Sequence, residues 1–136
     1  MNSDAFQVRT DIDAAIGEAV AANFSILFVH VSWAPMKLQR DLFLRFAADC
    51  QNKSPGVICF RYIDFTDVSD DYPQLFSLPG WAELRQQSGN AMIHGYGELV
   101  WMDHGNVVHV ERTLNYKNES ELTAKTNSLF TIDMSK

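Results

Sequence analysis

The chain has 136 residues, a length that is typical of one domain with one hydrophobic core. Hydrophobic residues make up 46% of it and charged residues 21%, and this composition excludes a disordered chain. The formal net charge of −6 argues against binding to nucleic acid or to an anionic membrane, because both need a basic surface.

The N-terminal segment shows no targeting signal. Residues 1–6 lack the basic and apolar stretches of a secretory signal, and no run reaches the roughly 18 apolar residues of a membrane span. We therefore expect a cytoplasmic protein. In that reducing compartment we expect Cys50 and Cys59 to be buried thiols, because their spacing matches no redox or metal motif.

The pattern of the first twenty residues predicts a short edge strand followed by a helix. Residues 6–9 form the predicted strand, and Thr10 or Asp11 is placed to cap the helix that follows. The apolar residues of this helix recur at helical spacing and comprise Ile12, Ala15, Ile16, Ala19 and Val20.

A βαβ unit is predicted next. Residues 25–32 and 57–63 are apolar and β-branched, which is typical of buried strands. Pro35 fits the first turn of the helix between them, and residues 54–56 end that unit. The buried stripe of this helix comprises Leu42, Phe43, Phe46, Ala47 and Cys50. Two strands joined by such a helix are expected to be parallel.

Residues 64–89 form a long connection, with a short helix predicted around 79–85. Within it, Trp81 either anchors the connection to the core or lines a pocket. Residues 98–102 and 107–111 predict a hairpin around the turn 103–106. A final helix follows, with Asn118 and Glu121 as a capping box and an apolar stripe that comprises Leu122, Thr126, Leu129 and Phe130.

This order predicts an α/β fold in which residues 1–136 form a single domain. A parallel βαβ unit followed by an antiparallel hairpin and a helix gives a mixed sheet of four to five strands with helices on both faces.

Two runs in the chain resemble the thioredoxin family. Residues 26–35 read I-L-F-V-H-V-S-W-A-P, similar to the strand that leads into the family's F-W-A-P-W-C-G-P-C motif. Residues 93–108 read I-H-G-Y-G-E-L-V-W-M-D-H-G-N-V-V, similar to the family's I-R-G-I-P-T-L-L-L-F-K-N-G-E-V. The resemblance covers about residues 8–130 and implies a thioredoxin-like fold.

The same resemblance implies that the family's reactive groups are missing. Alignment on W-A-P places Lys37 and Arg40 where the two cysteines of the family stand. A second register, with Trp33 directly before the first cysteine position, places Ala34 and Lys37 there. In both registers no thiol remains at the motif. Gly97 stands at the position of the family's cis-proline.

The family's buried acid is also replaced, by Val31 in the first register or by Phe28 in the second. Since thiol–disulfide exchange needs an attacking thiolate and a resolving thiol, a dithiol oxidoreductase is not expected.

Three functions remain open. The leading hypothesis is a redox-inactive domain, an adaptor, assembly factor or chaperone-like protein, that binds a protein or peptide partner through the former active-site face. The residues expected there are Trp33, Pro35, Met36, Lys37, Arg40, Tyr96 and Gly97. The alternative is an enzyme or sensor that binds a small anion near Lys37 and Arg40 at the start of the helix. Residual thiol chemistry at Cys50 or Cys59 is the third.

No cofactor or metal is expected, because the four histidines show neither i, i+4 spacing nor an accompanying carboxylate pattern. His30, within an apolar strand, is expected to be a hydrogen-bonded core residue. The sequence leaves the oligomeric state open.

Overall fold

The computed structural model describes residues 8–31, 37–66, 75, 77–88 and 96–132. The elements run in the order β1 Val8–Arg9, α1 Ile12–Ala21, β2 Phe24–His30, α2 Lys37–Lys53, β3 Cys59–Asp64, α4 Trp81–Ser88, β4 Tyr96–Asp103, β5 Asn106–Arg112, the 3₁₀ helix η2 Thr113–Asn115 and α5 Glu119–Phe130. This is the predicted order. No helix in the described ranges is long and apolar enough to cross a bilayer.

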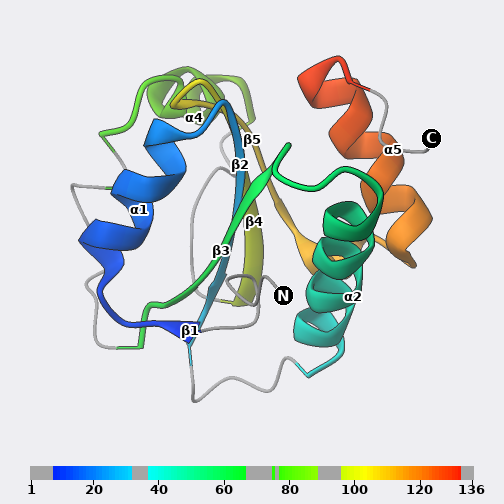
Figure 1. The fold of residues 1–136 in the computed structure, drawn as a ribbon. Coiled ribbons are helices and arrows are strands. Elements are labelled where there is room, and N and C mark those ends of the chain that lie inside the picture. The colour runs from blue at the N-terminus through cyan, green and yellow to red at the C-terminus, as the bar shows by residue number, and fades with distance from the viewer. Residues whose placement is uncertain (1–7, 32–36, 67–74, 76, 89–95, 133–136) are drawn as a thin grey trace.

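The five strands form one mixed sheet in the order β1-β3-β2-β4-β5. Strands β1, β3 and β2 are mutually parallel, and β4 runs antiparallel to both β2 and β5. Helices α1 and α4 lie on one face of the sheet, and α2 and α5 lie on the other (Figure 1). Both the parallel βαβ unit and the antiparallel hairpin are therefore confirmed.

The core fills both faces of the sheet. On the α2 side, the Phe28 ring stacks on the Phe43 ring with centroids 4.8 Å apart, so the middle of β2 is sealed by α2. On the same side the buried Trp101 Nε1 donates a 3.0 Å hydrogen bond to Thr126 Oγ1, which fastens α5 to β4. Trp81 is fully buried, as expected of a residue that anchors the long connection.

The predicted apolar stripe of α1 is confirmed except at its end. Ile12, Ala15, Ile16 and Ala19 are buried, whereas Val20 is 36% exposed. Val20 lies on the flank of the helix, beside Gly105 in the turn between β4 and β5. A residue on the flank of a stripe is covered only where another element overlaps it, and the approach of this turn leaves Val20 partly exposed.

Two other local predictions need adjustment. The strand predicted from residue 57 begins at Cys59, because Gly56 adopts a turn conformation with φ 78° and leaves Val57 38% exposed. At α5, Asn118 Oδ1 accepts from the Glu121 N–H at 3.0 Å as predicted, but the Glu121 carboxylate accepts from the Lys117 N–H instead. The stripe of α5 is otherwise buried, with Leu129 half-buried.

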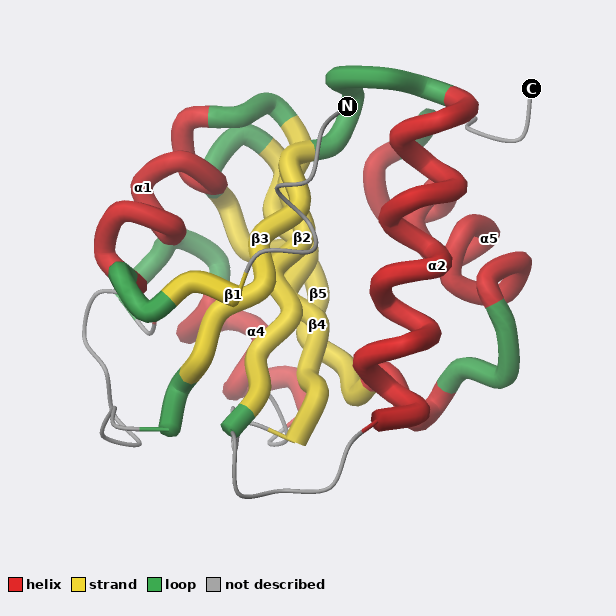
Figure 2. Tube along the Cα trace, turned by 60° about the horizontal axis from the view of Figure 1, so that its bottom comes forward, coloured by secondary structure: helices red, strands yellow, loops and turns green. Residues whose placement is uncertain are grey.

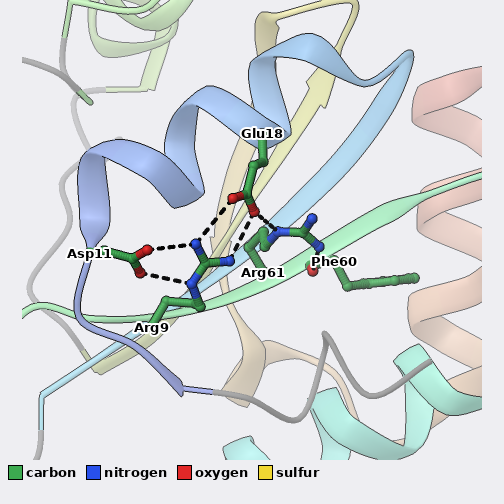
Figure 3. Close-up of polar contacts among 5 residues, drawn as sticks. All are labelled: Arg9, Asp11, Glu18, Phe60 and Arg61. Carbon is green, nitrogen blue, oxygen red and sulfur yellow. Dashed lines mark hydrogen bonds and ion pairs between the residues drawn. The ribbon is translucent and has the colours of Figure 1, made fainter. Parts of the chain in front are cut away.

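An ion-pair network joins β1, α1 and β3 at one edge of the sheet (Figure 3). Glu18 of α1 accepts from Arg9 of β1 at 2.9 Å and from Arg61 of β3 at 2.7 Å. Asp11 occupies the N-cap of α1. Its Oδ1 accepts a 2.7 Å hydrogen bond from Arg9 Nε, and its side chain makes no capping bond. The two guanidinium groups hold the pKa of Glu18 down at about 2, so this carboxylate stays charged in nearly all conditions.

Candidate partner-binding face

The candidate site lies at the edge of the sheet where β2 and β3 end and where α2 and β4 begin (Figure 2, lower edge). Of the predicted site residues, Trp33, Pro35 and Met36 lie outside the described residues, as does the side chain of Tyr96. The structure brings the other members, Lys37, Arg40 and Gly97, to this edge together with the backbone of Tyr96, which pairs with His30.

Gly97 is packed tightly beneath the first turn of α2. Its φ is 86°, and a Cβ at this position would lie 3.2 Å from Gln39 Cβ and 3.5 Å from Phe28 Cε1. Its carbonyl accepts a 2.6 Å hydrogen bond from Thr113 Oγ1, whose residue is fully buried. Glycine is therefore required here by both the backbone conformation and the close approach of the helix.

Lys37 and Arg40 have different surroundings. Lys37 is largely exposed, and its Nζ lies 2.8 Å from Asp41 Oδ2, a contact that holds the pKa of Asp41 below its usual value. Arg40 lies at 3.7 Å from Asp41 Oδ1, a distance too long for a hydrogen bond. The negative charge of Asp41 thus offsets mainly Lys37, and Arg40 is the less engaged of the two cations.

A polar cluster that the sequence analysis did not predict lies beside Arg40. His30 ends β2 and is paired in register with Asp64, which ends β3. The His30 ring stands edge-on to the Tyr62 ring, with centroids 5.0 Å apart. Burial lowers the pKa of His30, which is half-buried, and no described residue hydrogen-bonds its ring, so its expected hydrogen bond stays a prediction.

One signal in the sequence could have indicated this cluster. Parallel neighbouring strands place their carboxyl ends at one edge of a sheet. A histidine and an aspartate that end two such strands are therefore expected to lie side by side. No comparable sequence pattern predicts that Arg40, which lies on a helix, joins these two strand ends.

A second unpredicted feature is apolar surface at the same edge. Leu38 is 78% exposed in the first turn of α2, and Leu114 is 63% exposed in η2. Helix α2 packs against η2, and Gln39 and Thr113, the neighbours of these leucines in sequence, both contact Gly97. The two exposed leucines therefore lie on elements that meet beside Gly97, and we call them the leucine pair.

Glu98 is a buried acid on β4 that the sequence analysis did not single out. It is 2% exposed and pairs in register with Val29 of β2. Strand alternation places it on the opposite face from Trp101, the face covered by α1 and α4. The buried Val31 does lack a carboxyl group, but the protein buries an acid on the neighbouring strand.

The cysteines lie away from this edge. Cys50 is buried late in α2, and burial raises the pKa of its thiol to about 12. Cys59, expected to be buried, is half-buried at the start of β3 and borders a surface hollow of about 590 Å³. It is more accessible than predicted because it is the first residue of its strand. Within the described ranges, no three His, Cys, Asp or Glu side chains gather as a metal site.

Comparison with solved structures shows the fold. Desulfothioredoxin from Desulfovibrio vulgaris Hildenborough has a TM-score of 0.55 and 19% identity, over 89% of this chain and 95% of that one. Thioredoxin Mala s 13 from Malassezia sympodialis has a TM-score of 0.54 and 12% identity, over 90% of each chain. Human ERp44 has a TM-score of 0.59 and 13% identity, over 94% of this chain but only 30% of its own length.

No protein-family model and no curated protein matches the sequence. The structural likenesses nevertheless confirm the predicted fold class. The chain has a thioredoxin-like fold with a mixed five-stranded sheet and helices on both faces. At these identities the likeness concerns the fold alone.

Proposed function

We propose that the chain is a redox-inactive thioredoxin-like domain that binds a protein or peptide segment through the edge formed by α2, η2 and the start of β4. The observation that carries this proposal is the leucine pair, because two large apolar side chains exposed on adjoining elements suit an interaction site. Gly97 and the buried Thr113 fix the backbone beneath the pair, so the surface is held in place before a partner binds.

The thiol chemistry supports the redox-inactive part of the proposal. Lys37 and Arg40 stand where the resemblance places the family's cysteines, and neither side chain can attack a disulfide. The raised pKa of Cys50 leaves very little reactive thiolate at neutral pH, and the residue is buried. Cys59 begins β3, at the far end of that strand from the candidate edge.

Peptide selection tests the binding proposal. A library of linear peptides is panned on the protein, and the enriched peptides are titrated by fluorescence polarisation against the wild type and a Leu38→Glu/Leu114→Glu variant. Each glutamate places a charge in the apolar contact, so we expect at least a tenfold loss of affinity. Val57→Glu is the matched control, because Val57 is also exposed but follows α2 at the other end of β3.

Two outcomes would count against the proposal. Peptides that bind the double variant as tightly as the wild type would place the binding surface elsewhere. Reduction of insulin with dithiothreitol, catalysed above the uncatalysed rate, would show that the protein is an active oxidoreductase.

A further inference from the structure

A polar cluster at the carboxyl ends of β2 and β3 carries an inference that goes beyond partner binding at the leucine pair. The two strands are adjacent and parallel. The helix that follows β2, α2, covers one face of the sheet, and the helix that follows β3, α4, covers the other (Figure 1). In open α/β sheets, ligands bind where the connections of neighbouring strands diverge in this way.

Arg40 differs from the other arginines whose ion pairs are described. Arg9, Arg45 and Arg61 each have a carboxylate oxygen within 2.7–2.8 Å. The closest carboxylate contact described for Arg40 is the 3.7 Å approach to Asp41. A guanidinium carries five N–H donors, so most of those on Arg40 remain available, and its side chain is 44% exposed.

Tyr62 and His30 add two further donors beside this guanidinium. Burial raises the pKa of Tyr62 and keeps its hydroxyl protonated, although the charge of Arg40 and a weak hydrogen bond from it oppose this rise. Burial also lowers the pKa of His30, so near neutral pH the imidazole is uncharged and carries one N–H donor.

Asp64 accepts no hydrogen bond from the side chains of Tyr62 or His30. Its carboxylate Oδ1 accepts from the backbone N–H of Thr66 at 2.8 Å and also from the Thr66 hydroxyl. It acts on His30 and Tyr62 through its charge, without a hydrogen bond to either. The guanidinium of Arg40, the phenol of Tyr62 and the imidazole of His30 therefore lie together, and each has donors that no described residue accepts.

We propose that Arg40, Tyr62 and His30 bind the carboxylate of a ligand at the carboxyl ends of β2 and β3. The planar guanidinium matches a carboxylate with two parallel hydrogen bonds. The local charge favours a carboxylate over a doubly charged phosphate, because Asp41 lies beside Arg40 and Asp64 acts on both His30 and Tyr62 through its negative charge.

The carboxylate can come from a free small acid or from the end of a partner segment, and the experiment separates the two. Backbone amide shifts of the ¹⁵N-labelled protein are followed during titration with sodium acetate, with inorganic phosphate, and with sodium chloride at matched ionic strength. We expect saturable shifts for acetate, centred on residues 30, 40 and 62–65, with a Kd on the order of millimolar for so small a ligand.

Variants identify the residues responsible. Arg40→Met should weaken acetate binding at least tenfold, while Lys53→Met, a control that removes one positive charge at the other end of α2, should change it less than twofold. Arg40→Lys keeps the charge but loses the planar fork, so its affinity for acetate should lie between those of the wild type and Arg40→Met. Equal effects of Arg40→Met and Lys53→Met, or tighter binding of phosphate than of acetate, would overturn the proposal.

The source of the carboxylate is tested with an enriched peptide in two forms, one with a free C-terminus and one amidated. If the carboxylate belongs to the partner, the amidated peptide should bind the wild type more weakly, and the free-acid peptide should bind Arg40→Met more weakly. If neither change affects peptide binding but acetate binding still depends on Arg40, the ligand is a free acid. The Leu38→Glu/Leu114→Glu variant should still bind acetate. Peptide binding in this variant therefore tests the proposed partner site, and acetate binding in the same variant tests the carboxylate site separately.

Discussion

Gly97 shows how one residue sets the geometry of the candidate site. Its positive φ allows the chain to enter β4, and the missing side chain lets Gln39 approach. Sequence alignment placed Gly97 at the cis-proline position of the thioredoxin family and left its role open between backbone geometry and an open groove. The structure assigns it to backbone geometry and close packing, and its carbonyl already accepts a bond from Thr113.

Substitution of this glycine is expected to destabilise the fold. Gly97→Ala combines a strained φ, which costs roughly 1–2 kcal/mol in an L-residue, with a 3.2 Å contact to Gln39 Cβ. Gly56→Ala is the matched control, because Gly56 has φ 78° but nothing within 4 Å of the added Cβ. Urea unfolding should show a larger loss of unfolding free energy for Gly97→Ala. Equal losses would mean that the contact with Gln39 has no energetic consequence.

His30 is expected to make stability depend on pH. Because its pKa in the folded protein is below the ordinary value of 6.5, the unfolded chain takes up the proton first as the pH falls. The unfolding free energy should therefore decrease as the pH drops from above 6.5 toward the lowered pKa. His30→Gln should reduce this decrease, measured as urea midpoints at pH 7.5 and 5.5. An unchanged pH dependence in the variant would show that other groups cause it.

At the scale of elements, the ion-pair network of Glu18 connects three segments that are distant in sequence. Arg9 and Arg61 come from the parallel strands β1 and β3, and Glu18 reaches both from α1 (Figure 3). The sequence predicted each of these elements but not the network, because the spacing of charges along a chain does not show which charges meet across elements. β1 has only two residues paired with β3, and this network adds side-chain contacts to that short pairing.

Glu18→Gln is expected to loosen this attachment. The side chain is 41% exposed, so solvent screening limits the loss of unfolding free energy to about 1 kcal/mol. The pKa of Glu18 is lowered to about 2, so its contribution is present above the ordinary value of 4.5 and is lost as the pH falls toward 2. The control is Asp49→Asn, which removes a single ion pair with Lys53 on one helix. A loss no larger than that of the control would contradict a linking role for Glu18.

Elements were predicted best where one face is buried along their whole length. The stripe of α2 and the middle of β2 needed only a regular period, and both are confirmed. Errors occurred at ends and flanks, namely Val20, Val57 and Cys59, where burial depends on a neighbouring element.

At the scale of the whole molecule, the two cysteines lie in different environments. Cys50 is enclosed between α2 and the sheet, whereas Cys59 borders a surface hollow beside Arg61. Both belong to the βαβ unit, but one faces the core and the other begins a strand.

Thiol labelling is expected to distinguish them. In the folded protein one thiol should react with a disulfide reagent within minutes, and that reaction should disappear in Cys59→Ser. Cys50 should react only after unfolding in urea, because it is 3% exposed and its thiol has a pKa of about 12. Rapid labelling of Cys50 in the folded state would show that α2 opens readily and would weaken the case against residual thiol chemistry.

The sequence by itself determined the order of elements, the mixed sheet and the absence of cysteines from the W-A-P segment, because periodicity and motifs are local properties of a chain. Tertiary structure decided which side chains meet at the edge of the sheet. The leucine pair depends on η2 packing against α2, and the cluster of His30, Tyr62 and Arg40 depends on two strand ends and a helix coming together. Such contacts join residues far apart in sequence, so no local pattern encodes them.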